Sequence, residues 1–161
     1  MVKEIKVRIT FTKEIIEGTV SLSRDDKGRL ALFDYQVKGY FKDACSILAR
    51  DGSGTESAKL KAYKKIINGY VLVQPRVIPF EIEGGQEVLA DSGAIPAGAY
   101  VDLTITCLSD EHMVAVEEWL DYGWFRGFGQ WRNPGKNISW EKLEERSAER
   151  LSLMHASKSV T

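Results

Sequence analysis

Apolar and charged residues alternate at the start of the chain, and this period of two predicts a half-buried β-strand over residues 3–11. The same pattern predicts a strand over residues 99–107 and a short strand near residues 137–141. Two further β-type runs, 70–73 and 77–82, follow one another closely, and prolines restrict the second to an edge or a bulge. These two runs indicate a local hairpin.

Between the strands, apolar residues recur at helical spacing. This spacing predicts helices over residues 38–50, 57–67 and 110–122. Ser57 and Ser109 are of the residue type that favours the N-cap of the second and third helices, because a hydroxyl can accept a bond from a free amide of the first turn.

The charged C-terminal region predicts one more helix, through Leu143, Leu151 and Met154, before a flexible tail over residues 156–161. The predicted order is β, α, α, β-hairpin, β, α, glycine-rich loop, β, α, within one domain that covers residues 1–161. A chain that returns to a strand after each helical section favours an α+β fold with helices packed on one face of a mainly antiparallel sheet. The simplest such arrangement is the ferredoxin-like split βαβ fold.

Composition is that of a globular protein. Of the 161 residues, 43% are hydrophobic and 28% are charged, which are ordinary values for one folded domain. The chain does not begin with a secretory signal and no run is apolar enough to cross a bilayer, so we expect a cytoplasmic protein without a membrane partner. Cys45 and Cys107 lack the paired spacing of a zinc site, so we expect two buried free thiols, no metal and no cofactor.

Charge is distributed unevenly, although the net charge is only -1. Residues 36–70 carry seven cations against three carboxylates, whereas residues 81–102 hold five carboxylates and no cation. The lysines in and around the first two predicted helices are Lys59 and the five binding candidates Lys38, Lys42, Lys61, Lys64 and Lys65. This segregation indicates a basic face that could meet a polyanion, and it equally describes an ordinary solvated helix surface.

The stretch 122–140 combines four glycines, several aromatic residues and three cations with no carboxylate. Glycines permit a ligand to approach backbone amides, aromatic rings offer faces on which bases can stack, and cations can meet phosphates. The residues of these three kinds are Gly123, Gly127, Gly129 and Gly135, then Trp124, Phe125, Phe128 and Trp131, then Arg126, Arg132 and Lys136. The composition fits a loop that binds single-stranded nucleic acid, and it also fits a tight turn in which Trp124 and Phe128 anchor the core.

Two phosphate-binding motifs are excluded by spacing. Five residues rather than four separate Gly129 from Gly135, and Asn137 stands where a Walker A loop needs Ser or Thr. Gly127 and Gly129 are not followed by the third glycine of a dinucleotide fingerprint.

Candidates for catalysis are few. His112 and His155 have no evident nucleophile beside them, and presence without geometry does not make a catalyst. Glu117, Glu118 and Asp121 belong to one amphipathic helix and are expected to form its solvated face. No catalytic residue is assigned from the sequence.

Two segments resemble a known family. Residues 37–48, VKGYFKDACSIL, resemble the lysine-glycine and helix segment of the RAMP superfamily, which includes CRISPR effector backbone and crRNA-processing proteins. Residues 123–136 resemble the glycine-rich loop of the same superfamily. With residues 60–65 and 119–123, both segments are also similar to small proteins of bacteriophage early regions.

The RAMP resemblance implies a ferredoxin-like RNA-binding module, and the second resemblance implies that a phage makes it. On this basis we hypothesise that the protein acts in phage replication, or against host defence by mimicking or occupying a CRISPR component. It implies that Lys38, Gly39 and Lys42 lie near the RNA backbone together with the loop of residues 127–129. Asn137 departs from the family pattern, in which the loop continues with glycine and another cation. The histidine or loop aspartate that RAMP nucleases use has no matching position, so a ribonuclease is the least favoured hypothesis.

The sequence thus favours a non-catalytic protein that binds single-stranded RNA or DNA, or a CRISPR-type ribonucleoprotein. The candidate binding residues are Lys38, Gly39, Lys42, Lys61, Lys64, Lys65, Arg126, Gly127, Gly129, Trp131, Arg132 and Lys136. Two alternatives from other classes stay open. One is a sponge that sequesters a nucleotide signal, and the other is an assembly protein whose Trp-rich and Arg-rich loop is an interface in an oligomer.

Overall fold

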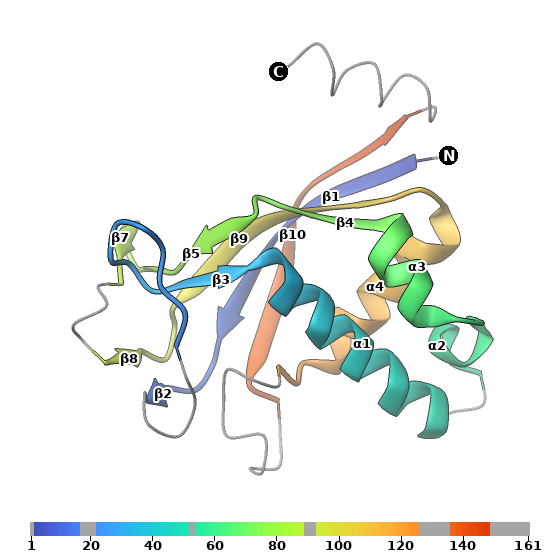
Figure 1. Cartoon of the computed structure of the whole chain (residues 1–161), viewed down its shortest axis with the longest axis horizontal. Coiled ribbons are helices and arrows are strands. Elements are labelled where there is room, and N and C mark those ends of the chain that lie inside the picture. Colours follow the sequence, from blue (N-terminus) through green and yellow to red (C-terminus); the bar gives the residue numbers. More distant parts are fainter. Residues whose placement is uncertain (1, 17–21, 52–53, 89–92, 126–135, 149–161) are drawn as a thin grey trace.

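The computed structural model describes residues 2–16, 22–51, 54–88, 93–125 and 136–148 (Figure 1). Its helices are α1 (Asp34–Asp51), α2 (Glu56–Lys59), α3 (Tyr63–Tyr70) and α4 (Asp110–Tyr122). The strands of its main sheet are β1 (Val2–Phe11), β4 (Val71–Gln74), β6 (Glu81–Ile82), β7 (Gln86–Glu87), β9 (Tyr100–Cys107) and β10 (Ile138–Ala148). Two smaller pairs join β2 (Ile15–Ile16) to β8 (Ala94–Ile95) and β3 (Ala31–Phe33) to β5 (Val77–Pro79).

The main sheet is antiparallel throughout. Strand β1 lies between β10 and β9, and β9 pairs along one half with β4 and at its start with β6. The order along the chain is therefore β1, α1, β4, β9, α4, β10, and the order in space is β10, β1, β9, β4. This is the ferredoxin-like split βαβ arrangement, and the predicted fold class is confirmed.

The helices cover one face of this sheet (Figure 1). Alternate residues of β1 and β9 point into the helical layer because successive side chains of a strand face opposite sides. The fully buried positions of these two strands and of the helices above them include Ile5, Val7, Ile9, Phe11, Val101, Ile105, Tyr40, Phe41, Val116 and Trp119. The other face of the sheet carries polar side chains, such as the pair Arg8 and Asp102, whose Nε and Oδ1 atoms are 2.8 Å apart.

Three elements occur where the sequence predicts them. The strand over 3–11, the strand over 99–107 and the helix over 110–122 correspond to β1, β9 and α4. Ser109 is the N-cap of α4, and its Oγ accepts a hydrogen bond from His112 N at 3.2 Å. Cys45 and Cys107 are buried, as expected.

The final predicted helix is wrong in the part that the structure describes. Leu143 lies in β10, which pairs with β1 from Phe11 opposite Ile138 to Val2 opposite Ala148. Residues 141–147 are exposed, so the strand has no apolar face to give a period of two. Leu151, Met154 and the tail 156–161 lie outside the described residues.

The first two predicted helices need different boundaries. Helix α1 begins at Asp34 rather than at residue 38, and Gln36 Oε1 accepts a bond from Phe33 N at 2.8 Å, as in half of a capping box. The predicted helix 57–67 is two helices, because Ala62 between them has a left-handed φ of 54°. Thr55 rather than Ser57 caps the shorter helix α2.

No helix among the described residues is long and apolar enough to span a bilayer. Within the same part of the chain, no group of three or more His, Cys, Asp and Glu side chains comes together as a metal site.

Candidate nucleic-acid interface

The two ends of the glycine-rich stretch are held side by side. Gly123 ends α4 with a φ of 74°, a conformation that glycine adopts without strain. Its carbonyl accepts bonds from Asn137 N at 2.9 Å and Ile138 N at 3.1 Å. The Asn137 side chain then accepts a bond from Phe125 N at 2.6 Å and donates one to Phe125 O at 3.0 Å. The segment that leaves at Phe125 therefore returns at a fixed point, which is buried.

A buried tyrosine connects this point to α1. Tyr40 Oη donates a hydrogen bond to Trp119 O and accepts one from Gly123 N at 3.3 Å. The Tyr40 ring is stacked on the Phe125 ring with centroids 4.8 Å apart. Burial raises the pKa of Tyr40, so its hydroxyl stays protonated and can keep donating. We call the hydrogen-bonded group of Gly123, Phe125 and Asn137 the loop root. Helix α1 contacts the loop root through its buried side, at Tyr40, and not through its lysines.

The aromatic predictions are only partly right. Phe125 is fully buried, so the hypothesis that it offers a face to a base is wrong. Trp124, which was expected as a core anchor, is only half buried, and Phe125 takes that place. Five candidate site residues lie outside the described part of the chain, together with Phe128 and Gly135: Arg126, Gly127, Gly129, Trp131 and Arg132.

Lys136 crosses the end of α4. A methyl group on Gly123 would lie 2.9 Å from Lys136 Cδ, so the aliphatic part of the lysine covers this glycine closely. The last turn of α4 contains no basic residue of its own, and the negative end of a helix dipole favours a cation there. Lys136 is exposed and can stabilise the helix end as well as meet a ligand.

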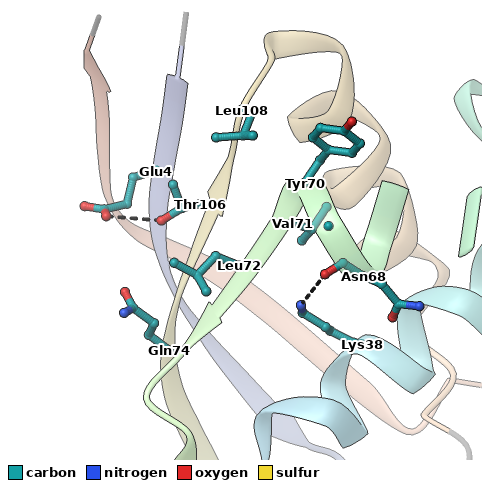
Figure 2. Close-up of a pocket in the computed structure, with 10 residues that line it drawn as sticks. Glu4, Lys38, Asn68, Tyr70, Val71, Leu72, Gln74, Thr106 and Leu108 are labelled. Atoms are coloured by element: carbon teal, nitrogen blue, oxygen red, sulfur yellow. Dashed lines mark hydrogen bonds between the residues drawn. The ribbon is translucent and has the colours of Figure 1, made fainter. Parts of the chain in front are cut away.

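The other five candidate lysines gather around two adjacent helices. Lys38 and Lys42 lie one turn apart on α1, Lys61 precedes α3, and Lys64 and Lys65 belong to α3. Lys38 Nζ donates to Asn68 O at 3.4 Å, which joins α1 to the end of α3 (Figure 2). Among the described residues, none of Lys42, Lys61, Lys64 and Lys65 is in an ion pair.

Lys38 is half buried, as is Lys42, whereas Lys61, Lys64 and Lys65 are exposed. Burial lowers the pKa of Lys38, the Asp34 carboxylate opposes this effect, and Lys42 adds to it. A partly desolvated ammonium group near a second lysine is stabilised by an anion, because an opposite charge favours the charged form. Gly39, next to it, is in the middle of α1, and a methyl group there would meet nothing within 4 Å. The helix backbone is therefore uncovered at this position.

Of the three acidic residues of α4 that the sequence predicts as a solvated face, Asp121 is exposed, whereas Glu117 and Glu118 are half buried. Glu118 accepts bonds from Glu56 N at 3.0 Å and Ser57 N at 2.8 Å, so it holds the start of α2. Glu117 Oε1 lies 3.0 Å from Lys142 Nζ, and Asp121 accepts a bond from Trp140 Nε1 at 2.8 Å. All three carboxylates make contacts with distant segments.

Although α1 contacts the loop root through Tyr40, Lys38 and Lys136 lie toward different edges of the sheet. Lys38 contacts the segment that leads into β4, whereas Lys136 leads into β10, and β9 and β1 separate these strands. That the two basic regions share one surface stays a prediction.

The architecture has a counterpart among solved structures. A chain of the Csm3–Csm4 subcomplex from a type III-A CRISPR–Cas interference complex matches with a TM-score of 0.50 over 99% of this chain and 96% of that chain. The fold is RAMP-like. Sequence identity with that chain is only 10%, so the likeness concerns the fold alone. No protein-family model and no curated protein matches the sequence. The similarity to phage early-region proteins stays a prediction.

Proposed function

We propose that this RAMP-like protein binds single-stranded RNA, with the phosphate backbone along the lysines of α1 and α3. The observation that supports this most is a group of lysines on and beside two adjacent helices that form no ion pair with the residues that the structure describes. Unpaired cations on a neutral protein attract a polyanion, since each phosphate contact releases counterions.

The glycine-rich loop would supply the second contact. Its candidate residues Gly127, Gly129, Trp131 and Arg132 provide bare amides, a ring and a cation. The hydrogen bonds of Asn137 in the loop root support this role, because a loop with fixed ends loses less conformational freedom when it binds.

The CRISPR setting is the finer part of the proposal. The structural neighbour belongs to a subcomplex of a CRISPR interference complex. A RAMP-like protein made by a phage would join or occupy such a ribonucleoprotein and so inhibit it. Co-purification with a type III complex, with RNA retained after washing at high salt, would support this setting, and a protein that never associates with the complex would contradict it.

The test of RNA binding is a salt titration of the full chain with fluorescein-labelled single-stranded RNA, followed by fluorescence polarisation. We expect the double variant Lys64→Met and Lys65→Met to weaken binding and to reduce the slope of log K against log salt by roughly 1–1.5, at about 0.7 per phosphate contact. Lys27→Met is the matched control, because Lys27 is an exposed lysine in a hairpin turn away from these helices. No binding by the wild type, or binding that does not depend on salt, would contradict the proposal.

The variant Gly39→Ala tests the role of Gly39 in RNA binding, because it is expected to change RNA binding and stability in opposite directions. Alanine in the middle of a helix stabilises by about 0.5–1 kcal/mol relative to glycine, and nothing obstructs the added methyl group. If RNA approaches this backbone, the variant will have a higher Tm but weaker RNA binding. A variant that is more stable and binds RNA as the wild type does would remove Gly39 from the site.

A further inference from the structure

A cavity of about 320 Å³ lies where α3 leads into β4, at the end of the main sheet opposite β10 (Figure 2). Lys38 of α1 closes one side, and outward-facing residues of β1 and β9 close the other. Its volume is at the lower end of the range of ligand pockets, about 300–1,000 Å³, so it suits one small molecular unit.

The apolar wall of the cavity is unusually exposed for its residue types. Tyr70 and Leu72 are 48% and 49% exposed, and both line the cavity. The Tyr70 ring is backed by the His112 ring, whose centroid is 5.9 Å away. A supported ring beside a branched side chain is a suitable surface for the face of a nucleobase.

Polar groups lie beside this wall. Gln74 follows Leu72 by two residues on β4 and lines the cavity, and its amide offers both donors and an acceptor, as the edge of a base requires. Asn68 also lines the cavity, and Figure 2 shows its side chain on the side of Lys38. Thr106 Oγ1 donates to Glu4 Oε1 at 3.2 Å, and Glu4 Oε2 lies 3.3 Å from Arg146 Nε. The one carboxylate of the cavity is therefore partly neutralised.

The cation and the carboxylate stand apart. Figure 2 shows Lys38 and Glu4 on opposite sides of the cavity. An ammonium group has three donors, whereas Lys38 donates one hydrogen bond within the described ranges, to Asn68 O, and this bond is long at 3.4 Å. Its partial burial makes an anionic partner favourable. The end of the cavity at Lys38 can thus accept a phosphate.

We propose that this cavity binds one nucleoside phosphate unit, with the phosphate at Lys38 and the base against Tyr70 and Leu72. The inference rests on the proposed RNA binding, to which it adds the place where a single nucleotide is held. The same chemistry could come from a nucleotide within a strand or from a free mononucleotide, and the experiment distinguishes the two.

The test compares cavity variants of the full chain in binding to fluorescein-labelled single-stranded RNA. We expect Tyr70→Ala to weaken binding roughly 5- to 150-fold, the effect of losing one stacked base, while Tyr70→Phe keeps the ring and binds as the wild type. Leu72→Glu is a second variant at a half-exposed position, and it should weaken binding as well. Circular dichroism and Tm confirm that each variant is folded, and Lys27→Met, at an exposed lysine outside both the cavity and the lysines of α1 and α3, is the control.

The outcomes separate this inference from the proposed function. If the double variant Lys64→Met and Lys65→Met weakens RNA binding but Tyr70→Ala and Leu72→Glu do not, the proposed nucleotide site in the cavity is overturned. The proposal that the protein binds RNA then still holds. A thermal shift with adenosine or uridine monophosphate that Tyr70→Ala abolishes, in a protein that binds no RNA, supports the cavity and overturns the proposed function. No shift and no RNA binding overturn both.

Discussion

Asn137 is the residue whose meaning changes most between sequence and structure. In the sequence it breaks a phosphate-loop pattern, since it stands where the related loops carry glycine and then a cation. In the structure it is buried and forms two hydrogen bonds with the backbone of Phe125, on the far side of the loop. Its amide is suited to this place because it is both a donor and an acceptor. The residue holds the loop root and is not available as a ligand contact.

Asn137→Ala should therefore destabilise the protein. It removes the two hydrogen bonds between the Asn137 side chain and the buried backbone of Phe125, at about 0.5–1.5 kcal/mol for each, so we expect a loss on the order of 1–3 kcal/mol. Urea denaturation measures this. Ser139→Ala, two residues further on and exposed, is the control and should change the free energy of unfolding by less than about 0.5 kcal/mol. If Asn137→Ala and Ser139→Ala have the same free energy of unfolding, the hydrogen bonds of Asn137 in the loop root do not stabilise the fold.

At the scale of elements, α4 holds the start of α2, the short helix that precedes α3. The Glu118 carboxylate of α4 accepts hydrogen bonds from the backbone amides of Glu56 and Ser57 at the start of α2. Its Oε2 also accepts a hydrogen bond from Ser57 Oγ at 2.6 Å. Trp119 Nε1 donates to the same Ser57 Oγ at 2.9 Å. A four-residue helix has little stability of its own, because nucleation is costly, so its position depends on these contacts. Contacts from α4 thus fix α2 and, through it, the position of the following segment, which carries Lys61 and leads into α3.

Glu118→Ala tests this dependence. We expect a loss of about 2 kcal/mol in the free energy of unfolding, since bonds to a charged acceptor contribute about 1.5–3 kcal/mol. Hydrogen exchange at the amides of Glu56 and Ser57 should become much faster. Glu117→Ala is the matched control: its ion pair with Lys142 is partly exposed and should contribute less than about 1 kcal/mol. Equal effects of the two variants would refute the role of Glu118.

At the scale of the whole molecule, one buried core joins the sheet to the helices. Cys107, at the end of β9, belongs to this core and pairs in register with Lys3 of β1 and Val71 of β4. Burial raises the pKa of its thiol to about 12. The thiol is therefore a neutral packing group in the folded protein.

This pKa predicts how stability depends on alkaline pH. Below the ordinary thiol pKa of 9.0, the folded and unfolded thiols are both protonated and the contribution is constant. Above it only the unfolded thiol ionises, so the free energy of unfolding falls as pH rises toward about 12, by at most roughly 1.4 kcal/mol per pH unit. Urea midpoints between about pH 9 and about pH 11 should fall less steeply in Cys107→Ala than in the wild type. Cys45→Ala keeps the Cys107 thiol and should retain most of the slope, and identical slopes in all three proteins would contradict this account.

Much of the fold was predictable because it depends on local patterns. Strands β1 and β9 and helix α4 are each buried on one side, so the apolar period is visible in the sequence. Strand β10 was mistaken for a helix over Leu143 because an exposed edge strand has no apolar period. The break of the second helix at Ala62 has no signal in residue type, since alanine rarely adopts a left-handed φ.

The candidate site was predictable only as a set of residue types. The sequence by itself determined which segments are basic, which are rich in glycine, and that the chain alternates strands and helices in the order of a split βαβ fold. Only the tertiary structure decided that Glu118 binds α2, that Tyr40 and Asn137 hold the loop root, and that Lys38 faces a cavity with Tyr70. The reason is physical: a helical or strand period reports one element's own buried side, whereas these contacts join polar atoms that are distant in sequence, and their partners are chosen by how the elements pack.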